Sequence, residues 1–168
     1  MVETWFSIPP ERIARRPLAE RDAAKLLRWK ADGGLVDGLI PDLLDALAPG
    51  DLLVVNNVRV VPARVAVQRP GGGRGELLFV QPWDGDDHCW VAWGRPAKRL
   101  VGRFLRSPIG DVIVEPRRTA TGALLVRLAS GEALSPVLER GGELPLPPYL
   151  QRPEEAEDRE RYRCYAHA

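Results

Sequence analysis

Short apolar runs separated by turn-forming residues characterise the first third of the chain. The run at 26–29 is followed by Asp32, Gly33 and Gly34, a pattern that predicts a β-hairpin. Pro41 then stands where the first turn of a helix accepts proline, and the leucines within 43–47 fall on one helical face. We therefore expect a hairpin followed by a short helix.

The stretch 50–64, GDLLVVNNVRVVPAR, combines an apolar run with a cluster of polar side chains. Four apolar residues, 52–55, predict a strand buried on both faces. Amides and guanidinium groups at the end of such a strand are typical of a ligand site in α/β proteins, although a solvated turn fits the pattern equally well. The polar residues concerned are Asn56, Asn57, Arg59 and Arg64.

The next part of the chain has the pattern of several short strands. Apolar runs at 77–80, 90–93, 112–114 and 124–128 are separated by turn-rich segments, which predicts a small β-barrel or sandwich over roughly 65–130. The glycine-rich segment 71–75 lacks the phosphate-loop pattern and leads into a strand, so we interpret it as a hairpin turn.

The last part of the chain changes composition again. Ser135 is a candidate N-cap for a short helix that has Pro136 at its first position and Gly141 just past its end. The prolines within 145–148 then disfavour a helix and predict a stiff extended path. That path is either a linker or a recognition segment presenting an aromatic ring and a guanidinium, those of Tyr149 and Arg152.

Charge is distributed unevenly along this chain of 168 residues. Residues 59–127 hold twelve Lys or Arg against six Asp or Glu, whereas the remainder holds twelve against seventeen. A basic segment within a nearly neutral chain fits a phosphate-bearing partner. The absence of a long apolar run indicates a cytoplasmic protein with no membrane partner, and the isolated His88–Cys89 pair is too weak a pattern to indicate a metal.

Several segments together are similar to one family, the S-adenosylmethionine:tRNA ribosyltransferase-isomerases of queuosine biosynthesis. The resemblance rests on IPPERIARRPLAERDAAKLL near the start, on GDLLVVNNVRVVPAR and on GRPAKRL at 94–100. GGELPLPPYLQRP at 141–153 and the following DRERY complete it. The order and spacing of these segments match the family over nearly the whole chain.

The resemblance implies an α/β plus β fold: part of a discontinuous α/β barrel-like domain with an inserted small β-barrel. We expect residues 1–64 to form the first part of the α/β domain, 65–134 the inserted barrel, and 135–168 an incomplete return into the α/β domain. The family continues for about as many residues again, so the chain is expected to correspond to its N-terminal half.

The implied reaction transfers and isomerises the ribosyl moiety of S-adenosylmethionine onto 7-aminomethyl-7-deazaguanine in tRNA, giving epoxyqueuosine. S-adenosylmethionine is then a substrate, no cofactor is permanently bound, and the tRNA partner is engaged at its anticodon region. Self-association is left open. The candidate substrate-binding residues are Asn56, Asn57, Arg59, Arg64, Tyr149 and Arg152; the candidate tRNA-binding residues are Arg95, Lys98 and Arg99.

Two positions depart from the family pattern. Where the family has NDTR, this chain has Asn56, Asn57, Val58 and Arg59, so an amide and an apolar group replace a carboxylate and a hydroxyl. Asn57 can still form hydrogen bonds, but it cannot accept a proton as the family's carboxylate can. The sequence offers no other obvious general base. The alternative hypothesis is therefore a truncated, catalytically inactive relative that binds tRNA.

Overall fold

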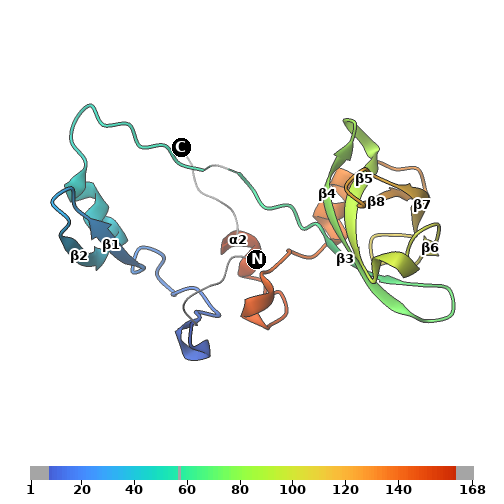
Figure 1. Ribbon diagram of the computed structural model, residues 1–168, viewed down its shortest axis with the longest axis horizontal. Helices are drawn as coiled ribbons and strands as arrows, with labels where there is room; N and C mark the ends of the chain where they lie inside the picture. The colour runs from blue at the N-terminus through green and yellow to red at the C-terminus, as the bar shows by residue number, and fades with distance from the viewer. Residues whose placement is uncertain (1–7, 57, 162–168) are drawn as a thin grey trace. The chain divides into compact units, whose positions relative to one another are not determined.

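The computed structural model describes residues 8–56 and 58–161. They fall into two compact units, each drawn in Figure 1. The first unit takes in the described residues up to Val58 together with Pro147–Pro153, and the second takes in Arg59–Leu146 and the described residues from Glu154 onward. Each unit is described separately below.

The first unit contains a two-stranded antiparallel hairpin, as the sequence predicted. Strands β1 (Lys25–Trp29) and β2 (Leu35–Leu39) pair with Trp29 opposite Leu35. The connecting turn is closed by the amide of Lys30, which donates to the carbonyl of Gly34 at 2.8 Å. Besides this hairpin, the described part of the unit contains the 3-10 helices η1 (Pro10–Arg12), η2 (Ile40–Ala46) and η4 (Pro148–Leu150).

The helix predicted after Pro41 is a 3-10 helix rather than an α-helix. η2 ends at Ala46, so Leu47 lies beyond it in an extended conformation and shares no helical face with Leu43 and Leu44. Leu44 is 72% exposed and Leu47 37%, whereas Leu43 is half-buried. The expected three-leucine apolar face is therefore not formed.

The predicted buried strand at 52–55 is also wrong. Residues 52–55 form no strand, and each of their four side chains is more than half exposed, with Leu52 at 87%. A strand requires backbone partners, and no backbone hydrogen bond from a described residue reaches this segment. The apolar run therefore lacks, among the described residues, the neighbours that would bury it.

The second unit is a six-stranded antiparallel sheet with strand order β3-β4-β5-β8-β7-β6. A bridge between Gln68 and Arg106, beside β6, brings the two edges together, so the sheet curls into a nearly closed barrel (Figure 1). This confirms the predicted β-rich segment, and all four predicted apolar runs lie in strands. The strands are β3 (Arg64–Gln68), β4 (Arg74–Trp83), β5 (Asp86–Arg95), β6 (Phe104–Leu105), β7 (Val112–Arg118) and β8 (Leu124–Leu128).

Alternating apolar residues of these strands fill the interior of the barrel. In β3 the alternation places Val65 and Val67 inside and Ala66 outside. Helix α1 (Leu134–Gly141) adds Leu134, Val137 and Leu138 to the same buried cluster. The short helix therefore packs against the barrel and contributes to its core.

Ser135 does not cap α1, contrary to the sequence-based expectation. The N-cap is Ala133, and Ser135 lies inside the helix with its hydroxyl donating to Oδ1 of Asp87 at 2.6 Å. The indole of Trp90 donates to the same oxygen at 2.8 Å. Burial raises the pKa of Asp87, but the hydrogen bonds from Ser135 and Trp90 outweigh it and leave the pKa below its ordinary value of 3.8.

We expect Asp87→Asn to destabilise the second unit by about 1–3 kcal/mol at neutral pH, because it weakens charge-assisted hydrogen bonds that tie α1 to β5. A lowered pKa in the folded state means that the stabilising effect is complete above the ordinary pKa and is lost as pH falls through the lowered one. Urea unfolding of native chain and variant at several pH values measures this difference, which should shrink below about pH 4.

The matched control is Asp84→Asn, in the β4–β5 turn that precedes Asp87. Asp84 is exposed and adopts a positive φ of 54°, a conformation that asparagine tolerates well. Its replacement should change the unfolding free energy by no more than about 0.5 kcal/mol at any pH. A pH-independent loss in Asp87→Asn would contradict the assigned role of the carboxylate.

The sequence predicted a stiff extended path through the proline segment. The structure differs, because part of the segment forms a helical turn. Pro148, Tyr149 and Leu150 form η4, which ends at Gln151 in the left-handed conformation (φ 51°). A 3-10 turn fits this sequence because proline is tolerated at the start of a helical turn. Beyond it, a short helix α2 (Asp158–Arg161) ends the described chain, and no helix among the described residues has the length and apolar character needed to cross a membrane.

Candidate functional site

The polar stretch after residue 55 begins with a local turn. The side-chain oxygen of Asn56 accepts the amide hydrogen of Val58 at 3.0 Å, which leaves its own amide group as a donor. Asn56 is exposed. Asn57 lies outside the described residues.

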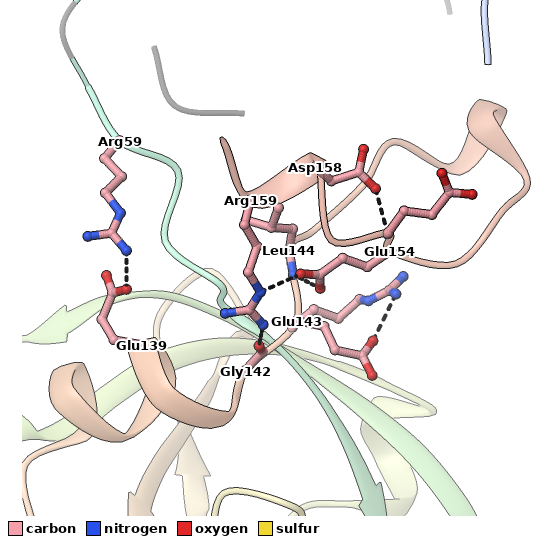
Figure 2. Close-up of polar contacts among 10 residues, drawn as sticks. Arg59, Glu139, Gly142, Glu143, Leu144, Glu154, Asp158 and Arg159 are labelled. Atoms are coloured by element: carbon pink, nitrogen blue, oxygen red, sulfur yellow. Dashed lines mark hydrogen bonds and ion pairs between the residues drawn. The ribbon is translucent and has the colours of Figure 1, made fainter. Parts of the chain in front are cut away.

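Arg59 forms an ion pair with a glutamate in the last turn of α1, and Arg64 forms one with a glutamate just beyond that helix. Arg59 Nη2 lies 2.6 Å from Glu139 Oε2, and Arg64 Nη2 lies 2.9 Å from Glu143 Oε2. Figure 2 shows the Arg59–Glu139 pair. The sequence did not indicate either glutamate, because the partners are 80 and 79 residues apart in the chain.

These two ion pairs still allow the arginines to bind a ligand. The Arg59 side chain is 57% exposed, and exposed ion pairs contribute at most about 1 kcal/mol, so a ligand carboxylate or phosphate can displace Glu139 at little cost. Arg64 is more buried, with its side chain 27% exposed, and because its Nε is closed off from solvent an anion can reach it only through its terminal nitrogens. Both guanidinium groups therefore keep donors for an anion.

Backbone and side-chain contacts fix the segment that carries these glutamates. Arg159 Nε donates to Glu154 Oε1 at 2.7 Å, and its Nη2 donates to the carbonyl of Gly142 at 2.7 Å. Glu154 in turn accepts the amide hydrogen of Leu144 at 2.8 Å (Figure 2). The segment from Glu154 to Arg159 is thereby held against residues 142–144.

Tyr149 and Arg152, the other candidate substrate-binding residues, belong to the first unit. Tyr149 is 57% exposed on η4. Arg152 donates from Nε to the carbonyl of Arg15 at 2.8 Å and from Nη1 to the carbonyl of Pro153 at 3.1 Å. The ring of Tyr149 is thus available for stacking, whereas Arg152 stabilises the loop that contains Arg15.

The candidate tRNA-binding residues lie together where β5 ends. Arg95 is the last residue of β5, and Lys98 and Arg99 lie in the 3-10 helix η3 (Ala97–Arg99). All three are exposed, and none forms an ion pair with a carboxylate in the described part of the chain. They present unneutralised positive charge to solvent.

Two cavities that the sequence did not indicate adjoin the contact between β3 and the segment around β6. One has a volume of about 310 Å³ and the other about 480 Å³, and both are lined by Gln68 and Arg106. Arg69 and Phe104 line the first, and Arg74 lines the second. The only signal in the sequence was the arginine on each side of the glycine-rich turn.

His88 and Cys89 show no sign of forming a reactive or metal-binding pair. His88 Nδ1 lies 2.9 Å from the carbonyl oxygen of Gly131, and burial raises the pKa of the Cys89 thiol, as do the nearby carboxylates of Glu115 and Asp86. A raised pKa lowers the thiolate fraction and hence the reactivity. Among residues 8–56 and 58–161, no cluster of three or more His, Cys, Asp or Glu side chains could hold a metal ion.

Comparisons with known proteins agree with the resemblance seen in the sequence. A family model described as "Queuosine biosynthesis protein" matches residues 2–168. The chain is 39% identical over 167 residues to the S-adenosylmethionine:tRNA ribosyltransferase-isomerase of Geobacter sulfurreducens, covering 96% of this chain and 48% of that protein. The enzyme of the same name from Pelobacter propionicus is 37% identical over 159 residues, covering 94% of this chain and 46% of that protein.

Among solved structures, S-adenosylmethionine tRNA ribosyltransferase from Thermotoga maritima aligns at 24% identity with a TM-score of 0.41. The alignment covers 81% of this chain and 47% of that one. The chain thus spans about half the length of the relatives that it matches. The family match over residues 2–168 confirms the sequence-based assignment, and the chain belongs to the queuosine biosynthesis protein family.

Proposed function

We propose that this protein acts as an S-adenosylmethionine:tRNA ribosyltransferase-isomerase. It transfers and isomerises the ribosyl moiety of S-adenosylmethionine onto 7-aminomethyl-7-deazaguanine in the anticodon region of tRNA, in the cytoplasm, giving epoxyqueuosine. The observation that carries the proposal is the 37–39% identity, over almost the whole chain, to proteins that bear this name. The first unit contributes to a discontinuous α/β barrel-like domain into which the β-barrel is inserted.

Arg95, Lys98 and Arg99 contact the tRNA backbone in this proposal. Their exposure and their lack of carboxylate partners among the described residues support the role, since each can neutralise a phosphate without first breaking an ion pair. Such contacts give affinity that depends on salt and carry little sequence information. Specificity for the modified base must come from other residues.

Arg59 and Arg64 bind an anionic group of a substrate, which is either the carboxylate of S-adenosylmethionine or a tRNA phosphate. The weak, exposed ion pair of Arg59 and the partly exposed guanidinium of Arg64 support this role. Asn56, Asn57, Tyr149 and Arg152 complete the proposed substrate-binding set. The amides offer hydrogen bonds to base edges, and Tyr149 offers a stacking surface.

The test is release of adenine from S-adenosylmethionine by the purified protein, followed by chromatography. We expect release only when tRNA carrying the deazaguanine base is present, because the ribosyl group must have an acceptor. Free S-adenosylmethionine alone and tRNA with an ordinary guanine serve as controls. Binding of tRNA without adenine release would overturn the proposal in favour of an inactive tRNA-binding relative.

A further inference from the structure

The two edges of the barrel, β3 and β6, meet at a seam. We define the seam as Gln68 and Arg69 where β3 ends, Arg74 where β4 begins, and Phe104–Arg106 opposite them. Within residues 8–56 and 58–161, a single bridge, Gln68 with Arg106, closes the seam, with hydrogen bonds of 2.8 and 3.0 Å. Both cavities described above adjoin it. In Figure 1 the β3–β4 hairpin extends out from the barrel on the side where β6 lies.

Positive charge dominates the seam. Arg69, Arg74 and Arg106 line the cavities, and no carboxylate lines either of them. None of the three arginines is ion-paired within the described chain. A site with several guanidinium groups and no acidic partner favours a ligand that carries phosphate.

Arg69 is held in place beside the first cavity. Its guanidinium lies over Gly73, where an added Cβ would overlap it, so the glycine leaves the space that the side chain occupies. The Nε of Arg69 is buried and has no hydrogen-bond partner among the described residues. Because this Nε is closed off from solvent, an anion in the first cavity would meet the Arg69 guanidinium through its terminal nitrogens.

Phe104 adds an aromatic surface to the first cavity. Its side chain is 47% exposed, whereas the neighbouring Leu105 is fully buried in the core. The alternation of the strand therefore turns the ring of Phe104 outward, toward the arginines. An exposed aromatic ring beside guanidinium groups is the combination that binds unpaired nucleotides, by base stacking and phosphate contacts.

The seam is continuous with the basic residues at the end of β5. Arg95 pairs in register with Glu76, two residues along β4 from Arg74. The carbonyl oxygen of Arg95 would lie 3.1 Å from a Cβ added at Gly75, which lines the second cavity. A strand of RNA could therefore contact both groups of residues.

We propose that the seam binds a single-stranded RNA segment, with phosphates on Arg69, Arg74 and Arg106 and a base stacked on Phe104. The source of that RNA, an unpaired loop of tRNA, rests on the proposed function. Binding itself does not, because a short unmodified oligonucleotide contains both the phosphates and the bases that the seam recognises.

The experiment measures binding of a fluorescent oligouridine to the 168-residue chain by anisotropy at several salt concentrations. We expect the double variant Arg74→Ala, Arg106→Ala to bind at least about tenfold more weakly near 50 mM salt, with the slope of log K against log salt reduced by about 1.4. We expect Phe104→Leu to weaken binding by at least about fivefold and Phe104→Tyr to bind within about twofold of the native chain.

The matched control is Arg117→Ala with Arg140→Ala, which removes the same charge from exposed positions outside the seam. This pair should weaken binding by no more than about threefold, and circular dichroism checks that all variants are folded. An equal loss in the control pair would reveal binding by net charge alone. That result, or native affinity in Phe104→Leu, would overturn the proposal.

Failure of the seam and failure of the proposed function give different results. If adenine is released from S-adenosylmethionine while the seam variants bind RNA like the native chain, the seam proposal is wrong and the proposed function stands. If the seam variants lose binding as expected but the native protein releases no adenine, the seam binds RNA and the proposed function is wrong.

Discussion

Replacing Gly142 by alanine is expected to destabilise the barrel unit by about 3 kcal/mol. Gly142 is buried at the end of α1, and an added Cβ would overlap the carbonyl oxygen of Pro62 and lie 2.8 Å from that of Leu138. Both obstacles are backbone atoms, so relief requires α1 to move away from the segment that leads into β3. Urea unfolding, followed by the circular dichroism of the sheet, measures the loss.

The neighbouring residue provides the control. The one tight contact of a Cβ at Gly141 would be with the side chain of Ile109, 3.0 Å from its Cγ2, since the Cα of Ile109 would lie at an ordinary 3.8 Å, and a side chain can shift where backbone cannot. Alanine is also favoured over glycine inside a helix by about 1 kcal/mol. Gly141→Ala should therefore stay within about 1 kcal/mol of the native chain. Equal losses at the two positions would contradict the close packing at Gly142.

Truncating Leu138 to alanine is expected to cost about 2–5 kcal/mol. The Leu138 side chain is fully buried in the barrel core, and it belongs to the same cluster as Val65 and Leu77. The substitution removes apolar contacts and leaves a cavity between α1 and the sheet, which the rigid barrel can close only in part. Thermal and urea unfolding should both show the loss.

An exposed strand residue tests whether that loss comes from burial. Val80 lies in β4 and is 48% exposed, so Val80→Ala removes little buried area. We expect a change of no more than about 1 kcal/mol. If Leu138→Ala were as mild as Val80→Ala, α1 would not be a stable part of the core.

The sequence was most informative where local chemistry decides the structure. Turn-forming residues marked the β1–β2 hairpin and the glycine-rich β3–β4 turn, and alternating apolar residues marked the long strands of the barrel. These signals are contained within a few neighbouring residues. They therefore needed no knowledge of the remote parts of the chain.

Features that depend on distant partners could not be predicted in this way. The apolar run at 52–55 reads as a buried strand, but nothing among the described residues pairs with it. Ser135 is a residue type that often caps helices, yet its hydroxyl donates a hydrogen bond to the carboxylate of Asp87 on β5 instead. The glutamates that pair with Arg59 and Arg64 follow from the packing of α1 and its C-terminal turn, which no local pattern encodes.

Residue chemistry marked candidates for a ligand site in two segments, and family resemblance then assigned the individual roles. The structure adds geometry to that set: Arg59 and Arg64 retain donors for an anion, and Arg95, Lys98 and Arg99 stand exposed and unpaired among the described residues. The seam arginines and Phe104 had no sequence motif to mark them. They became visible only when the curled sheet brought residues 68 and 106 together.

The most direct test of the proposed function follows the fate of the ribosyl group itself. S-adenosylmethionine radiolabelled in its ribose carbons, or separately in its methyl group, is incubated with the protein and tRNA carrying 7-aminomethyl-7-deazaguanine. We expect ribose label, and no methyl label, to enter the tRNA in step with adenine release. Methyl label in the tRNA, or ribose label that stays wholly with small molecules while tRNA is bound, would contradict ribosyl transfer.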